Sequence, residues 1–472
     1  MPFTVNVKWG KDIFKDVTID TEGTVEDFKA QLFSLSGVAP ERQKIMVPRS
    51  GQLKDGTSWD KYKLKDKMTI MLMGSKAEIK APEKETVFVE DLPDATPFMI
   101  DHQPGLMNTG NTCYLNSTIQ ALSVVPPLQK SLIRYAKENG NDRVANHLGN
   151  LLNILEQKNE PFLPLGMFIT TMRQVYPQFD ERGPNGVHMQ QDAEECFSLL
   201  LQSMKNVPGL RGSGDIISDL FEGEYAVTSS CVECPEEKEV TIEPFSKIPV
   251  HIDAETSFLQ SGIKNRMSEH ITKTSSILGR EAIYEKSSKI SKLPFYLPVQ
   301  FVRFFWRQDK NLRAKICKPV EFPQRLDMFE FCTEELQNKL APNREAISKA
   351  EEKALNIKKG HEKKSEEPET EALANTDETM EDVDAGAALD NDTGFYELLA
   401  VVSHQGRSAE GGHYVAWVKR DAETWLLYDD DKVSVIPADD IKKLTGHGGA
   451  DWHIAYLCIY GSLRKQELMP DL

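Results

Sequence analysis

The residue best suited to nucleophilic chemistry is Cys113, which follows a polar, glycine-containing turn that starts at Gly105. Leu115, Ile119 and Leu122 come next at helical spacing, so the sequence predicts that Cys113 lies in the first turn of a helix. The positive end of a helix dipole favours the thiolate over the thiol, and the thiolate is the nucleophile. On the turn alone the alternative stays open that Cys113 is a small buried apolar residue.

Asn108 lies five residues before this cysteine, in the same turn. Its side-chain amide could donate to the oxygen that becomes negative when a carbonyl carbon is attacked. The backbone N–H of Cys113 would then be the second donor. The plain alternative is that Asn108 only forms the turn.

Two strand-like segments near the C-terminus carry a histidine and an acid that could complete this chemistry. A hairpin centred on Asp421 places His413 directly opposite Asp429 on the same face, and it sends Asp430 to the other face. A carboxylate beside an imidazole fixes its tautomer, which leaves the second ring nitrogen free to take a proton from Cys113. Residues 405–412 read as a polar loop that could close over the site.

Several segments together resemble the ubiquitin-specific protease family: Gly105–Asn116, Gln190–Glu195, Gly412–Tyr414 and Tyr428–Asp430. The resemblance covers about Pro104 to Gly461, with one long interruption. It implies an α+β protein with a papain-like catalytic domain of fingers, palm and thumb. It also implies a thiol protease that removes ubiquitin from conjugated proteins.

The resemblance assigns roles to particular residues. Cys113 is the nucleophile and His413 the general base and acid. Asp429 orients the histidine, and Asn108 stabilises the oxyanion. The channel for the C-terminal tail of ubiquitin is implied for Gln190, Gln191, Asp192, Gly412 and Tyr414. This chemistry needs no metal and no organic cofactor.

Two channel residues also have an interpretation that does not depend on the resemblance. Gly412 leaves room for a substrate backbone to pass close to His413. Asp192 precedes an apolar stripe at helical spacing, so it could simply be an acid at a helix start.

The first 74 residues show the pattern of a small β-grasp domain. Residues 3–9 alternate, and after a turn a second alternation places Ile13, Val17 and Ile19 on one face. Thr24 stands three residues before Asp27, as at a capped helix start, and short strands follow at 44–47 and 68–72.

This order resembles that of ubiquitin-like domains. The segment runs on as Gly74-Ser75 and has no Gly-Gly terminus, which favours docking over conjugation. The combination with the protease suggests the proteasome-associated branch of the family, in which this domain docks on the regulatory particle. A generic α+β domain without a partner is the alternative.

The composition predicts the remaining organisation. Residues 75–103 form a linker rich in Lys, Glu and Pro, residues 104–464 the catalytic domain, and residues 465–472 a tail. Within the catalytic domain an acidic insert at about 360–392 has too few apolar residues to fold, so we expect it to be disordered.

Charge and cysteine usage limit the class of protein. A net charge of −17 excludes nucleic acid as the expected partner. No apolar run approaches the roughly 18 residues of a membrane span, and no signal peptide is apparent. Seven cysteines are too few for a disulfide framework, which indicates the cytoplasm or nucleus. Cys231 and Cys234 make half of a zinc site, but no second close pair follows, so we expect no metal.

Two other functions stay open on sequence alone. One is a non-catalytic adaptor that binds ubiquitin with a protease fold. The other is a protease specific for a different ubiquitin-like modifier, because several modifiers share part of the same tail.

Overall fold

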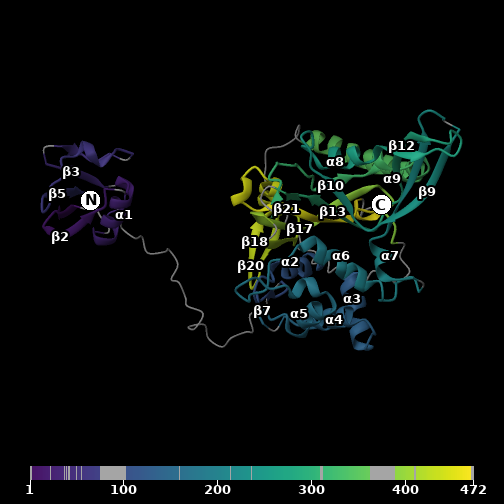
Figure 1. The fold of residues 1–472 in the computed structure, drawn as a ribbon, viewed down its shortest axis with the longest axis horizontal. Helices are drawn as coiled ribbons and strands as arrows, with labels where there is room; N and C mark the ends of the chain where they lie inside the picture. The colour runs from purple at the N-terminus through teal and green to yellow at the C-terminus, as the bar shows by residue number, and fades with distance from the viewer. Residues whose placement is uncertain are drawn as a thin grey trace. The chain divides into compact units, whose positions relative to one another are not determined.

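A computed structural model provides the fold. It describes residues 3–74, 102–361, 389–408 and 411–468, apart from residues 22, 37, 39, 41, 42, 49, 55, 159, 213, 235 and 309–311. The chain divides into two compact units, Met1–Pro97 and Phe98–Leu472, which are labelled by element in Figure 1. Residues 75–101 of the predicted linker and 362–388 of the predicted insert lie outside the described residues.

The N-terminal unit is a five-stranded sheet in the order β2-β1-β5-β3-β4, with one helix, α1 (Val25–Ser36). Its strands are β1 Phe3–Trp9, β2 Asp12–Ile19, β3 Lys44–Val47, β4 Gly51–Gln52 and β5 Thr69–Met73, and a 3-10 helix, η2, spans Trp59–Lys61. Buried valine, isoleucine and leucine side chains of sheet and helix form its core. The predicted capped start of α1 is confirmed, because Thr24 and Asp27 bond each other's backbone N–H groups.

One detail of the second strand differs from the predicted alternation. Val17 and Ile19 are buried as expected, but Ile13 is 52% exposed. The pairing of β1 with β2 shifts by one residue between Val5 and Val7, and Asp16 has a φ of 58°. This bulge reverses the faces of the residues before it, so Phe14 packs against the core in place of Ile13.

The larger unit is built on a ten-stranded sheet whose main order is β10-β13-β21-β17-β18-β19-β20. Its strands are β10 Ile248–His251, β13 Tyr296–Val302, β14 Phe304–Arg307, β15 Leu312–Lys315, β16 Arg325–Asp327, β17 Phe395–Ser408, β18 Gly411–Lys419, β19 Thr424–Asp429, β20 Lys432–Pro437 and β21 Ile454–Ser462. The predicted loop 405–412 is mostly strand, because β17 continues to Ser408 and β18 begins at Gly411.

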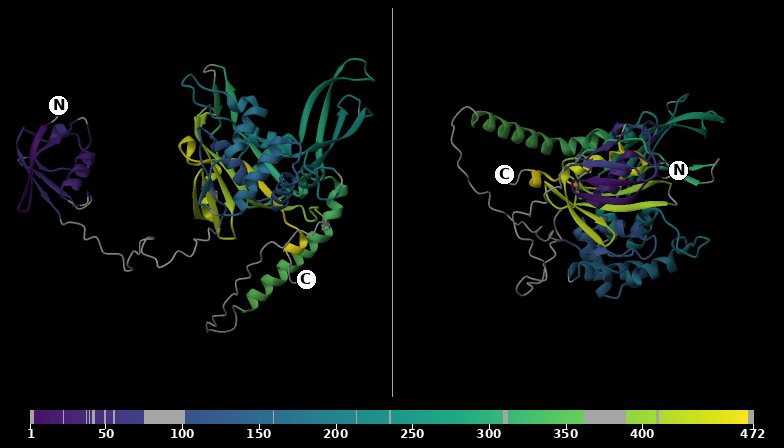
Figure 2. Two further views of the ribbon diagram at one scale, coloured as in Figure 1. Left: turned by 90° about the horizontal axis from the view of Figure 1, so that it is seen from below. Right: turned by 90° about the vertical axis from the view of Figure 1, so that its left-hand side faces the viewer.

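A separate four-stranded sheet extends from the body of this unit, as Figure 2 shows. Its order is β11-β12-β8-β9, with β8 Gly223–Cys231, β9 Lys238–Phe245, β11 Ser268–Thr274 and β12 Glu281–Lys292. Cys231 and Cys234 lie where β8 ends, and both are free cysteines.

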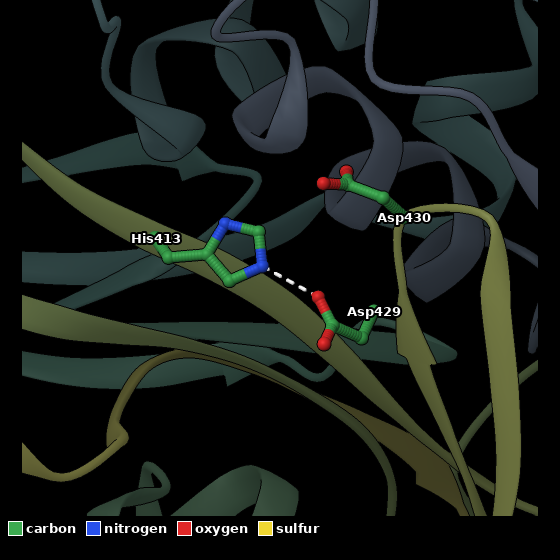
Figure 3. A group of neighbouring side chains, drawn as sticks. All are labelled: His413, Asp429 and Asp430. Atoms are coloured by element: carbon green, nitrogen blue, oxygen red, sulfur yellow. Dashed lines mark hydrogen bonds and ion pairs between the residues drawn. The ribbon is translucent and has the colours of Figure 1, made fainter.

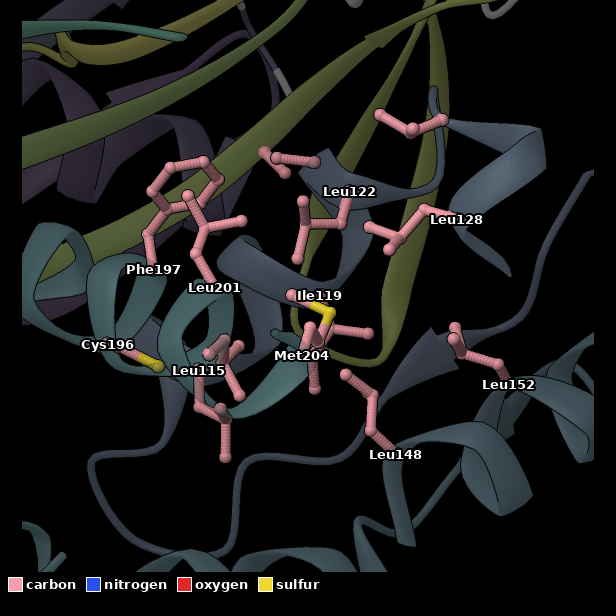
Figure 4. Packing of buried hydrophobic residues seen from close by; sticks show 14 of the residues in the cluster. Leu115, Ile119, Leu122, Leu128, Leu148, Leu152, Cys196, Phe197, Leu201 and Met204 are labelled. Carbon is pink, nitrogen blue, oxygen red and sulfur yellow. The ribbon is translucent and has the colours of Figure 1, made fainter. Parts of the chain in front are cut away.

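Helices cover the sheet near its centre. They are α2 Cys113–Leu122, α3 Pro126–Lys137, α4 Arg143–Glu156, α5 Gly166–Val175, α6 Ala193–Met204 and α7 Ile216–Leu220, with a 3-10 turn, η4, at Pro177–Asp180 and the short parallel strands β6 Gly105–Leu106 and β7 Phe162–Leu163. Every residue of α2 is buried, and this helix packs against both β18 and α6. Figure 4 shows the apolar side chains of α2, α3, α4 and α6 that meet around it.

The remaining helices are α8 Leu259–Arg266, α9 Glu334–His361 and α10 Lys465–Leu468, with 3-10 helices η5 Phe329–Phe331, η6 Ala438–Thr445 and η7 Gly449–Asp451. Among the helices in the described part of the chain, none is long and apolar enough to cross a membrane. The mixture of helices and mainly antiparallel strands confirms the predicted α+β class.

Arg344 on α9 joins the segment before this helix to the start of β17, the strand that follows the acidic insert. Its guanidinium lies 4.5 Å from the ring centre of Phe329 and 4.1 Å from that of Phe395. It also pairs with Asp327 at 2.6 Å and donates to the carbonyl oxygen of Thr393. The return of the chain into β17 is therefore anchored to α9.

Candidate active site

The predicted nucleophile begins a buried helix, as the sequence indicates. Cys113 is the first residue of α2, and it is 2% exposed. The turn before it depends on Asn108, whose Oδ1 accepts the backbone N–H groups of Gly110 and Thr112. No acidic residue lies in the first turn of α2, so the positive helix end is not neutralised there.

His413 and Asp429 form a close pair on neighbouring strands. His413 Nε2 lies 2.5 Å from Asp429 Oδ1, and the two side chains are 34% and 47% exposed. Figure 3 shows the imidazole and the carboxylate facing each other. Because Nε2 is engaged with the carboxylate, Nδ1 is the nitrogen left for the sulfur of Cys113.

The predicted direct pairing of His413 with Asp429 is wrong by two residues. Ala416 pairs with Tyr428, which centres the hairpin on Ala422 and not on Asp421. The carboxylate of Asp421 accepts the backbone N–H groups of the two residues after Ala422, which closes the turn later than predicted. A shift of two preserves the face of every side chain, so histidine and acid still meet as diagonal neighbours.

The prediction that Asp430 points away from this pair is also wrong. Strand β19 ends at Asp429, and Asp430 has a left-handed φ of 54°, so strand alternation no longer applies. Its carboxylate accepts from Asn108 Nδ2 at 2.9 Å and from Asn116 Nδ2 at 2.8 Å. Asp430 therefore joins the turn at residues 429–431, the acid turn, to the turn before α2 at residues 107–112, the nucleophile turn.

The electrostatics of the pair favour charge separation. The hydrogen bond with Cys113 is the main cause that raises the pKa of His413 to about 9, and the bond with Asp429 raises it further. Burial opposes this shift. At neutral pH the raised pKa keeps the imidazole of His413 protonated next to the sulfur.

Comparison with known proteins assigns this chain to a family. Residues 104–460 match the family described as ubiquitin carboxyl-terminal hydrolase, and residues 4–77 match the ubiquitin family. The chain belongs to the ubiquitin carboxyl-terminal hydrolase family. It is therefore a cysteine protease with a ubiquitin-like domain at its N-terminal end, as the sequence predicts.

Relatives in this family align along almost the whole chain. Ubiquitin carboxyl-terminal hydrolase 6 of Arabidopsis thaliana is 41% identical over 480 residues, which is 97% of this chain and 98% of the relative. Ubiquitin carboxyl-terminal hydrolase 14 of Caenorhabditis elegans is 35% identical over 485 residues, 99% of this chain and 95% of the relative.

A solved structure shares the fold. The SAGA Ubp8/Sgf11/Sus1/Sgf73 DUB module bound to ubiquitin aldehyde matches with a TM-score of 0.52 at 19% identity. The match covers 76% of this chain and 70% of that chain. At this identity the likeness concerns the fold alone.

In this family member the three residues before α6 each make a specific hydrogen bond, and that of Gln190 reaches the nucleophile. Gln190 Nε2 donates to Cys113 Sγ at 3.1 Å, and Gln191 Nε2 donates to the carbonyl oxygen of Gln178 at 2.7 Å. Asp192 caps α6 by accepting the backbone N–H of Glu194, which agrees with its interpretation as an acid at a helix start.

Asp192 also faces a cavity of about 160 Å³. Burial raises the pKa of its carboxyl, while a hydrogen bond from the Tyr456 hydroxyl, 2.7 Å long, opposes that rise. The cavity is further lined by Glu194, Gln300, Val302, Arg303, Phe304, Phe305, Trp306 and Arg313. Structural and channel roles for Asp192 are therefore compatible.

Gly412 and Tyr414 lie in a tightly packed part of β18. A Cβ at Gly412 would come within 2.3 Å of the Gln405 carbonyl oxygen and 2.4 Å of His404 Nε2, and its φ is 144°. The packing beneath the strand thus requires glycine, independently of any substrate. Tyr414 is fully buried, with its ring 4.5 Å from that of His404.

Three contacts at this site were not predicted from the sequence, although the resemblance assigned Gln190 itself to the channel. Asn116 is buried and donates to Asp430 and to the Leu106 carbonyl oxygen; the same helix also carries Ser117, Thr118 and Gln120, so its carboxamide did not stand out in the sequence. Gly105 approaches the acid turn, where a Cβ would lie 2.5 Å from the Asp431 carbonyl oxygen. The contact of Gln190 with the sulfur had no sequence signal.

One group of side chains in the described part of the chain is close enough to share a metal ion: His413, Asp429 and Asp430, whose ligand atoms lie within 4.8 Å of one another. Both oxygens of Asp430 already accept amide N–H groups, and His413 Nε2 is bonded to Asp429. These atoms therefore serve the hydrogen-bond network. Cys196 and Cys458 are fully buried and belong to the hydrophobic core.

Proposed function

We propose that this chain is a deubiquitinase that hydrolyses the isopeptide bond at the C-terminal glycine of ubiquitin on conjugated proteins. The observation that supports it most directly is the arrangement of Cys113, His413 and Asp429, in which the sulfur is the main cause of the raised histidine pKa. Family membership supports ubiquitin as the substrate class.

In the proposed mechanism the Cys113 thiolate attacks the carbonyl carbon of the last glycine of ubiquitin. The π electrons move to the carbonyl oxygen, which Asn108 and the backbone N–H of Cys113 stabilise. His413 protonates the departing lysine amine, and a thioester remains. His413 then removes a proton from water, which attacks the thioester and releases ubiquitin. Asp429 holds the imidazole ring throughout.

The tail of ubiquitin would reach the nucleophile along the segment formed by Gln190, Gln191 and Asp192, past Gly412 and Tyr414. The cavity beside Asp192 supports this, because it joins partly buried carboxylates to aromatic side chains close to α6. A short, extended tail needs such a concave surface with a few placed polar groups.

A ubiquitin C-terminal electrophile tests the proposal. The wild-type chain should form one covalent adduct, Cys113→Ala should form none, and Cys317→Ala, a half-buried cysteine elsewhere, should react like wild type. A chain that binds the probe without an adduct would be an adaptor. Reaction only with the probe of another modifier would change the substrate class.

We further propose that residues 1–74 dock on the regulatory particle of the proteasome, in the cytoplasm and nucleus. The match of residues 4–77 to the ubiquitin family supports a docking role. So does the outer face of β5, where Met71 and Met73 are 49% and 44% exposed. Deletion of residues 1–74 should abolish co-purification with proteasomes while the electrophile still reacts. Unchanged co-purification would disprove docking through this unit.

A further inference from the structure

The side chain of Gln190 contacts the reacting atom itself. Its Nε2 lies 3.1 Å from Cys113 Sγ, and the residue is only 9% exposed. A donor at this distance from sulfur, in a site from which water is largely removed, interacts with the anion more strongly than with the neutral thiol.

The backbone around Gln190 is fixed on its C-terminal side. Gln191 is bonded to the Gln178 carbonyl oxygen, and Asp192 is held by both the N-terminus of α6 and the Tyr456 hydroxyl. The amide is thus positioned before substrate arrives, as a group that stabilises charge must be.

The side-chain amide of Asn108 is directed at its own turn and at Asp430, which leaves its second N–H for the oxyanion. Asn108 Oδ1 accepts two backbone N–H groups of its own turn, and Nδ2 donates to Asp430. Among the described side chains, Gln190 and His413 are therefore the donors directed at the sulfur.

We propose that Gln190 is a further catalytic residue, whose amide N–H stabilises the negative charge on Cys113 Sγ opposite the imidazolium of His413. The donor increases the fraction of Cys113 that is ionised at neutral pH, where the enzyme must attack. This role concerns the free enzyme and does not depend on which modifier is cleaved.

The test follows the rate at which iodoacetamide alkylates Cys113 between pH 4 and 10, read by mass spectrometry of the Cys113 peptide. Gln190→Met keeps the length of the side chain and removes the N–H. We expect the midpoint of its profile to rise by about one pH unit, with a roughly tenfold slower reaction on the acidic side. Gln190→Glu places a second anion there and should raise the midpoint further.

Gln178→Met is the matched control, because Gln178 supplies its backbone carbonyl oxygen to this segment and its side chain does not contact the sulfur. Its midpoint should equal that of wild type. A merely structural role for Gln190 would slow alkylation equally at every pH or lower the melting temperature without moving the midpoint, and this result would overturn the proposal. Equal shifts in Gln178→Met and Gln190→Met would also overturn it.

The experiment needs no ubiquitin, so the two proposals can fail separately. If the midpoint shifts but the protein does not react with the ubiquitin electrophile, the role of Gln190 is supported and the proposed function is refuted. If the midpoint does not shift but the protein reacts with the electrophile, the proposed function is supported and the role of Gln190 is refuted.

Discussion

Substitution of Gly105 tests how closely the acid turn and the nucleophile turn depend on each other. Gly105 forms β6 with Leu106, whose backbone N–H donates to the Asp430 carbonyl oxygen at 2.8 Å. An alanine Cβ at Gly105 would lie 2.5 Å from the carbonyl oxygen of Asp431 and 2.8 Å from that of Asp430. Both neighbours are backbone atoms, which cannot rotate away as a side-chain end could.

The size of the effect follows from these distances. Ordinary contact begins at 3.4 Å, so the acid turn must retreat by about 0.9 Å in Gly105→Ala. The 2.5 Å bond between His413 and Asp429 would be stretched by a similar amount, because Asp429 enters that turn. A misplacement of about 1 Å in an active site costs roughly 100-fold in rate. We expect kcat to fall by this factor with little change in KM.

Steady-state cleavage of a fluorogenic ubiquitin C-terminal amide measures the two constants, and thermal unfolding followed by circular dichroism confirms that the variant is folded. Gly183→Ala is the control, since its Cβ would meet the end of the Asn185 side chain at 3.2 Å and the Val187 carbonyl oxygen at 3.9 Å, which is ordinary contact. The reasoning is refuted if folded Gly105→Ala keeps kcat within threefold of wild type.

Three further results are expected. Because the pKa of His413 is raised to about 9, activity should decline on the alkaline side with a midpoint near pH 9. The contribution of this ion pair to the free energy of unfolding should be complete below about pH 6.5 and be lost as the pH rises through 9. An NMR titration of Cys113→Ala should show a lower pKa for His413, because the contact with the sulfur is removed. Gln129→Met should raise the free energy of unfolding by about 1–2 kcal/mol in urea, because the amide nitrogen of Gln129 is buried without a partner beside an apolar cavity; lower stability would contradict this. Arg344→Ala should lower that free energy by about 2 kcal/mol, and Arg344→Lys should recover little of it because an ammonium cannot stack on two rings; full recovery would show that charge alone suffices.

The parts of the site that follow from local pattern could be predicted. Cys113 begins a helix because apolar residues recur at helical spacing immediately after it, and that placement is confirmed. His413 and Asp429 share a face because strand alternation has a period of two, which survives the error of two residues in their register. The error itself arose because the sequence pattern did not show that the Asp421 carboxylate closes the turn one residue later.

The parts that depend on single backbone angles or distant contacts could not be predicted. A bulge at Asp16 and a left-handed φ at Asp430 each interrupt the alternation of side-chain faces along a strand. Neither position is a glycine, which is the usual sequence indication of a positive φ. The contact of Gln190 with Cys113 joins residues 77 positions apart. Only the packing of α6 against α2 brings them together.

The same packing explains why backbone atoms matter as much as the three reactive side chains. Asp430 accepts Leu106 through its carbonyl oxygen and Asn108 and Asn116 through its carboxylate, so the acid turn is attached to the nucleophile turn at three points. His413 reaches the sulfur only while β19 holds Asp429 beside it. A substitution that displaces any one of these segments therefore alters the interaction of His413 with the Cys113 sulfur, even where no reactive side chain is replaced.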